Sequence, residues 1–144
     1  MCSPGTNVVM NGELDETHCI TSSSATYDGD VWVSAELVVY GDSIVHHIIE
    51  GDTVLTYTKP QFDDHFVSQQ KDDWSDFGVF TDSWKKKDGQ SLSSGYIALQ
   101  AESHSIDFKG LQLLNLKGCM DPQASNYKTY YVEPDNSLCV YLKQ

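Results

Sequence analysis

The stretch that decides the fold runs from Val31 to Pro60 and reads VWVSAELVVYGDSIVHHIIEGDTVLTYTKP. It contains three apolar, β-branched runs, which the pairs Gly41-Asp42 and Gly51-Asp52 separate. Short runs divided by glycine-containing turns are typical of consecutive antiparallel strands. The stretch therefore predicts a three-stranded meander.

The first run of this meander has two different faces, because side chains alternate along a strand. One face carries Val33, Ala35, Leu37 and Val39. The other carries Trp32, Ser34, Glu36, Val38 and Tyr40. The second face mixes aromatic, carboxylate and hydroxyl groups, which suits either the solvent side of a sheet or the lining of a sugar-binding groove.

The size and charge of the chain limit the kinds of molecule that it can bind. The chain has 144 residues, enough for one buried core, and a net charge of -12 from 21 acidic residues and 9 lysines, with no arginine. Nucleic acid is excluded, because proteins bind its phosphates with Lys and Arg. No apolar stretch reaches the ~18 residues that a membrane span needs, so we predict no membrane insertion. Neutral carbohydrate and divalent cations fit better.

Four cysteines stand near the two ends of the chain, at Cys2, Cys19, Cys119 and Cys139. Four cysteines allow three pairings. The spacing favours pairing within each end, where each bridge closes a short loop worth about 3 kcal/mol in the chain-entropy account. The spacings are not those of zinc ligands. We therefore predict structural disulfides and an oxidising compartment.

The segment from Gln61 to Gln90 mixes aromatic residues with aspartates and keeps neither a strand nor a helix period. It predicts a long loop with a helical turn, and long loops often carry function. Its aromatics, Trp74 among them, either stack on sugar rings or anchor the loop to the sheet. Asp72, Asp73 and Asp76 offer hard oxygen ligands for calcium, but without EF-hand spacing we favour a solvated acidic loop. We assign no metal ligand.

Strand character returns between Gly95 and Leu116, which reads GYIALQAESHSIDFKGLQLLNL. Two alternating runs joined by Glu102 to Ser105 predict a β-hairpin of core strands. One face of its first run carries Tyr96, Ala98, Gln100 and Glu102. The composition then changes abruptly at Gly118, and the remaining segment is too small for a core of its own without a disulfide.

Several segments together point to a known family. CSPGTNV, HCITSSSATYDGD, WVSAELVVYGD, HHIIEGDTVLTYTKPQ and GYIALQAESHSIDFKGLQLLNL resemble, in order, the C-terminal half of the 3-keto-disaccharide hydrolase domain family. The tail, GCMDPQASNY followed by DNSLCVY, is similar to a short cysteine repeat of secreted and surface proteins.

The resemblance implies an all-β fold, an antiparallel concanavalin-like jelly-roll β-sandwich. Residues 1–117 would form the C-terminal half of this sandwich, and residues 118–144 a disulfide-stapled appendage. Family members carry further strands before the point that matches Met1. We expect a longer polypeptide to supply those strands, with self-association between chains as the alternative.

The resemblance also implies a chemistry. A ketone at C3 of a sugar acidifies the neighbouring C–H, so a general base and an acid for the leaving oxygen can cleave the glycosidic bond. Because the adjacent His46 and His47 point to opposite faces of a strand, at most one can line the groove. The catalytic candidates are Glu36, His47, Gln100, Glu102 and His104, and the sugar-binding candidates are Trp32, Tyr40, Tyr96 and Trp74.

For each of these residues, a packed or solvated structural role is the alternative. Three function classes follow. We favour a secreted, periplasmic or cell-surface glycoside hydrolase acting on 3-keto-disaccharides or related glycans. The others are a non-catalytic glycan-binding module and a surface-assembly protein built from jelly-roll subunits.

Overall fold

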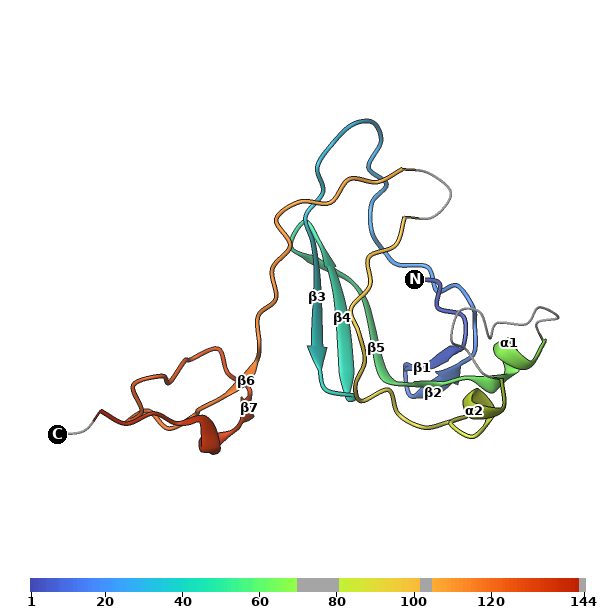
Figure 1. The fold of residues 1–144 in the computed structure, drawn as a ribbon. Coiled ribbons are helices and arrows are strands. Elements are labelled where there is room, and N and C mark those ends of the chain that lie inside the picture. The colour runs from blue at the N-terminus through green and yellow to red at the C-terminus, as the bar shows by residue number, and fades with distance from the viewer. Residues whose placement is uncertain (70–80, 102–104, 143–144) are drawn as a thin grey trace. The chain divides into compact units, whose positions relative to one another are not determined.

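The computed structural model describes residues 1–69, 81–101 and 105–142. The chain divides into two compact units, Met1–Ile97 and Ala98–Gln144. Each unit has its own disulfide. Each also has its own sheet, and the strands of both sheets are labelled in Figure 1.

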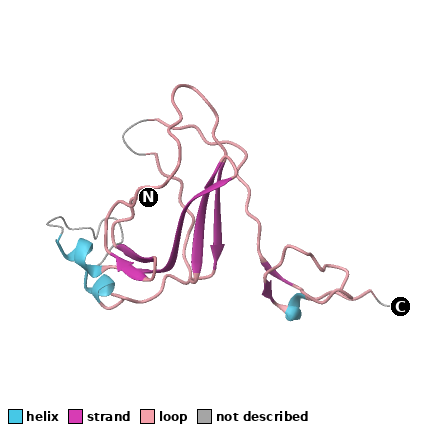
Figure 2. Ribbon diagram, turned by 180° about the vertical axis from the view of Figure 1, so that it is seen from behind, coloured by secondary structure: helices cyan, strands magenta, loops and turns pink. Residues whose placement is uncertain are grey.

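The first unit is built on one antiparallel five-stranded sheet with the order β2-β1-β5-β4-β3 (Figure 2). Its strands are β1 (Thr6–Met10), β2 (Glu13–Asp15), β3 (Ala35–Tyr40), β4 (Ile44–Ile49) and β5 (Asp52–Phe62). The predicted class, an antiparallel all-β, sandwich-like fold with a disulfide-stapled C-terminal region, is confirmed.

The predicted meander is confirmed as β3, β4 and β5. Gly41 and Gly51 occupy the two turns with φ values of 58° and 89°, a region that glycine enters without the steric cost of a Cβ. β3 begins only at Ala35, so Val31 to Ser34 precede the sheet instead of extending it.

The core of this unit lies against one face of the sheet. Val8, Val45, Leu55 and Tyr57 form its buried cluster. Met1, Met10 and Ile20 pack against that cluster. The Cys2–Cys19 disulfide and the hydrogen bond from the Ile20 amide to the Met1 carbonyl, 2.7 Å, hold the N-terminal segment in place. On the same face, Leu37 and Val39 of β3 remain 54% and 45% exposed.

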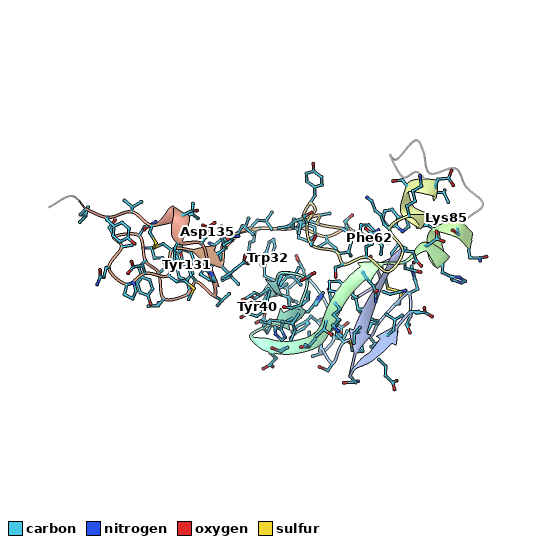
Figure 3. The ribbon with its side chains drawn as sticks, turned by 90° about the horizontal axis from the view of Figure 1, so that it is seen from below. Trp32, Tyr40, Phe62, Lys85, Tyr131 and Asp135 are labelled. Atoms are coloured by element: carbon cyan, nitrogen blue, oxygen red, sulfur yellow. A yellow bond between two sulfur atoms is a disulfide. The ribbon has the colours of Figure 1, made fainter. Side chains whose placement is uncertain are left out.

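Two short helices replace part of the predicted long loop. They are α1 (Asp64–Gln69) and α2 (Thr81–Lys85), and β5 itself continues to Phe62. Trp84 of α2 packs edge-on against Phe62 with ring centroids 5.1 Å apart, and its indole N–H donates to the Asp63 carbonyl, 2.8 Å. In Figure 3, Phe62 and Lys85 mark this end of the sheet, and Tyr40 marks the β3 end.

The predicted β-hairpin between Gly95 and Leu116 is wrong for the described residues. Neither 95–101 nor 105–116 contains a strand, and apolar residues such as Ile97, Leu111 and Leu113 are exposed there. Alternation shows that a segment can form a strand, but a strand also needs a neighbour for its backbone hydrogen bonds.

The second unit is small and contains the predicted second disulfide. Cys119–Cys139 ties β6 (Lys117–Gly118), which pairs in parallel with β7 (Glu133–Pro134), to the 3-10 turn η2 (Asn136–Leu138). Gly118 is required by packing, since a Cβ there would lie 2.4 Å from the Tyr131 ring. Figure 3 shows Tyr131 and Asp135 in this unit.

Both predicted disulfides are therefore formed, which is compatible with an extracellular location. Within the described parts of the chain, none of the helices has the length and hydropathy to span a bilayer.

Candidate functional site

Two adjacent histidines in β4 define the two faces of the central sheet. Paired residues of an antiparallel sheet share a face. His47 pairs with Leu37 and Leu55, so it lies on the core side, which we call the His47 face. His46 pairs with Val38 and Thr56 on the opposite side, the His46 face.

On the His47 face, an imidazole and a phenol are hydrogen-bonded. His47 Nε2 lies 3.2 Å from the hydroxyl oxygen of Tyr57, and the two rings are 5.5 Å apart and tilted by 47°. Tyr57 is only 9% exposed and belongs to the core cluster, while His47 is partly buried. The pair therefore sits where the core meets the open edge of the sheet.

Burial shifts the acidity of both groups. Desolvation lowers the pKa of His47, with a smaller contribution from the positive charge of the Met1 amine. Desolvation likewise raises the pKa of Tyr57. At neutral pH the imidazole is thus a neutral group able to accept a proton, and the phenol stays protonated and able to donate one. A base and an acid in direct contact are the two groups that an elimination needs.

The His46 face is more open and more polar. His46 Nδ1 is hydrogen-bonded to Thr56 Oγ1 at 2.9 Å, and the Tyr40 ring meets the His46 ring edge-on at 6.2 Å. Glu36 lies on this face too, since it pairs with Ile48. Hydroxyl and carboxylate groups can accept hydrogen bonds from sugar hydroxyls, and aromatic rings can stack on sugar rings. Glu36 and Tyr40 are exposed, so water has free access to this face.

The register separates residues that the sequence analysis placed together. Glu36 and Tyr40 share a face, as expected, but His47 points to the other side of the sheet, so Glu36 and His47 cannot act on one substrate atom. Trp32 precedes β3, so strand alternation does not set its direction.

The other residues that the sequence analysis proposed for the site are not on the sheet or lie outside the described residues. Tyr96 and Gln100 are exposed and lie outside any strand. Trp74, Glu102 and His104 fall outside the described residues, as do the three aspartates proposed for calcium. Among the residues that are described, no group of three His, Cys, Asp or Glu side chains is placed to hold a metal ion.

Tyr57 is the functional candidate that the sequence analysis missed. The Gly51 turn pairs Ile49 with Asp52 and Ile48 with Thr53, and a regular ladder would then set Val54 opposite His47. A bulge shifts the register so that Leu55 takes this place, which brings Tyr57 to the His47 face. The Val54 carbonyl instead accepts hydrogen bonds from the amide and hydroxyl of Ser23, 2.9 and 3.1 Å.

A second polar feature, a recess, lies at the other end of the sheet. A recess of about 240 Å³ between the N-terminal segment and α1 is lined in part by Glu16, His18, Asp63 and His65. The Ser3 amide donates to the His18 carbonyl and the Asp63 amide to the Gly5 carbonyl, which fix two of its walls. The recess is smaller than the ~300 Å³ at which ligand pockets usually begin.

The antiparallel five-stranded sheet and the disulfide of the first unit define a β-rich class of domain. The family of 3-keto-alpha-glucoside-1,2-lyase-like domains matches residues 5–114, and the chain belongs to this family. No curated protein and no solved structure matches the chain. The match includes both faces of the meander and ends before the Cys119–Cys139 disulfide.

Proposed function

We propose that this domain cleaves the glycosidic bond of 3-keto-glucosides by elimination, with His47 as the base and Tyr57 as the acid. The observation that carries the proposal is the His47–Tyr57 contact, 3.2 Å long, inside a domain of the 3-keto-alpha-glucoside-1,2-lyase-like family. The family supports an action on sugars, and the pair supports this particular step.

His47 and Tyr57 carry out the proton transfers of this step. In the tautomer with its proton on Nε2, His47 removes the hydrogen at C2, which the C3 ketone acidifies. The electron pair forms the C1–C2 double bond, the C1–O bond breaks, and the leaving oxygen takes the proton of the Tyr57 hydroxyl. The imidazolium, which took the C2 proton on Nδ1, then returns its Nε2 proton to the phenolate through their hydrogen bond, and proton exchange with water restores the tautomer with its proton on Nε2. The products are an alcohol and an unsaturated 3-keto sugar, and addition of water to that sugar makes the overall reaction a hydrolysis.

The surroundings of the pair suit this chemistry. Leu55 lies directly across from His47, and Tyr57 lies directly across from Val45, so apolar groups flank both reacting side chains. Electrostatic and proton-transfer interactions are stronger where water is excluded. Leu37, opposite His47 on β3, is exposed and marks the open side from which a sugar ring would approach.

The first experiment is turnover of a 3-keto-α-glucoside with a chromogenic leaving group, with the unoxidised glucoside as the matched substrate. The proposal expects release from the keto substrate alone, because only its C2–H is acidified. Release from both substrates at equal rates, or from neither, would contradict it.

Three variants assign the roles. Tyr57→Phe keeps the ring in the core and removes only the hydroxyl, and His47→Gln removes the base. His46→Gln is the matched control, one residue away on the opposite face. We expect the first two to lose 10²–10⁴-fold in kcat, the usual contribution of general acid–base catalysis, and the control to retain its rate. Loss in the control alone would overturn the assignment.

A second function is favoured by the His46 face. There Tyr40, Glu36 and the His46–Thr56 pair offer an exposed aromatic edge with hydrogen-bonding groups, which is the composition of a glycan-binding surface. Calorimetric titration with neutral oligosaccharides tests it, and Tyr40→Ala should abolish binding while leaving cleavage unchanged. The two disulfides support the proposal that the protein works outside the cytosol, as a secreted, periplasmic or cell-surface protein.

A further inference from the structure

The two edges of the five-stranded sheet differ in the way they meet solvent. One edge is β2, a strand of 3 residues that contains Glu13 and Asp15. Short, charged edges resist pairing with other strands. The other edge is β3, a strand of 6 residues, AELVVY, whose only charge is Glu36. In a chain of net charge -12, this is an unusually neutral edge.

β3 is also regular along its whole length. All six of its residues pair with β4 without a register shift, whereas β5 carries irregularities towards both of its neighbours. A regular strand presents alternate backbone N–H and C=O groups outward over its full length. Among the described residues, no strand pairs with that outer side.

Apolar side chains accompany this open edge. On the His47 face, Leu37 is 54% and Val39 is 45% exposed, although both lie on the side of the sheet that carries the core. Exposed aliphatic groups beside unpaired strand backbone mark a site for another strand. An added strand would bury the apolar side chains and would also pair with the free backbone N–H and C=O groups.

We propose that β3 pairs antiparallel with β3 of a second copy of this chain, about a two-fold axis at Val38. In this register Leu37 lies opposite the partner's Val39, and Glu36 lies opposite the partner's Tyr40. The apolar pair therefore continues the His47 face across the junction. No carboxylate meets a carboxylate, so the strand is complementary to itself.

The symmetry explains why the assembly ends at two chains. An isologous contact uses the same edge of both copies, so the joined five-stranded sheets, as far as their residues are described, end on both sides in a short acidic β2 edge. The net charge of each copy opposes association. Because salt screens this repulsion over about 8 Å at 0.15 M, higher salt should tighten the dimer.

The register gives a sharp chemical test with the full chain. All four native cysteines are already in disulfides, so an introduced cysteine is the single reactive thiol. Directly opposed residues in an antiparallel pair have Cα atoms ~4.5–5.5 Å apart, within the 4.4–6.8 Å range of disulfides. Val38→Cys should therefore cross-link to its copy under mild oxidation. Val39→Cys, whose copy lies two residues along the partner strand, should cross-link at least tenfold more slowly.

Sedimentation equilibrium provides the second readout. We expect a two-fold mass for the unmodified chain and the mass of one chain for Val39→Lys, because the added charge would lie inside the junction. Leu14→Lys on β2 is the matched control, since Leu14 is 50% exposed on the opposite edge, and it should remain dimeric. A single-chain mass at all concentrations, a larger polymer, or faster cross-linking at Val39→Cys than at Val38→Cys would overturn the proposal.

Discussion

The two faces of the β3–β4–β5 sheet carry adjacent histidines that meet very different surroundings. His46 is hydrogen-bonded to the Thr56 hydroxyl on an open, polar surface. His47 is hydrogen-bonded to the hydroxyl of Tyr57, a residue of the aliphatic core cluster, and this bond is partly buried. The difference teaches that residue type alone does not make a general base. In the proposed mechanism, desolvation and a proton-donating partner distinguish His47 from His46, and both follow from the face that the register gives to each histidine.

The largest expected difference between the faces is catalytic. His47→Gln should lower kcat on a 3-keto-glucoside by 10²–10⁴-fold, the range of general acid–base catalysis, since it removes the base that the proposal requires. His46→Gln should change kcat by less than about threefold, because its side chain is directed away from the reacting groups. Steady-state kinetics of both variants measure this difference. Equal losses of kcat in the two variants would contradict a special role for His47.

The next difference is in packing. Leu55→Ala on the His47 face should lower the free energy of unfolding by ~2–5 kcal/mol, because Leu55 is buried and its removal leaves a cavity. Leu37→Ala, opposite the same histidine but exposed on the edge strand, should cost below about 1 kcal/mol in the monomer. Urea unfolding of the first unit measures both at a concentration that keeps the chain monomeric. A larger loss at Leu37 would show that the edge is covered.

A pH difference follows from the depressed pKa of His47. The folded state holds this imidazole neutral, so below the unfolded value of 6.5 the unfolded chain binds more protons than the folded one. The stabilising contribution is therefore fully present above pH 6.5 and is lost as pH falls through and below that value. His47→Gln should flatten this part of the stability profile relative to the unmodified chain. An unchanged slope would mean that another group is responsible.

The smallest expected effect lies on the His46 face. Thr56→Val removes the hydroxyl that bonds to His46 and keeps the β-branched shape, and water can replace the lost bond at this exposed position. We expect a change in unfolding free energy within about 0.5 kcal/mol, as for most surface substitutions. Tyr57→Phe is the paired comparison on the other face, where a partly buried hydrogen bond is lost, and thermal unfolding of the two variants compares them. An effect of Thr56→Val as large as that of Tyr57→Phe would contradict the assignment of an open face.

Local pattern predicted the meander well, since β-branched runs and glycine turns fix strands and their alternation. The same rules placed Glu36 and Tyr40 on one face and separated His46 from His47. They failed where the outcome depends on register and on partners. The bulge between β4 and β5 turns Tyr57 towards His47, and nothing in the local pattern reveals an inserted residue.

The Gly95–Leu116 segment shows the second limit. Its alternation is typical of strands, yet its described residues form none. A strand forms only where a neighbouring strand pairs with its backbone, and that neighbour can be far away in the sequence. Local alternation is therefore insufficient to predict a strand. The disulfides were predictable because short sequence separation itself favours closure within each end.

The central claim is that proton removal by the His47 face cleaves the substrate. The most direct measurement compares 3-keto-α-glucosides carrying hydrogen or deuterium at C2, with the unmodified protein, His46→Gln and His47→Gln. The account predicts a primary isotope effect on kcat/KM in the unmodified protein and in His46→Gln, with turnover nearly abolished in His47→Gln. Cleavage without an isotope effect, at a rate unchanged by His47→Gln, would contradict it.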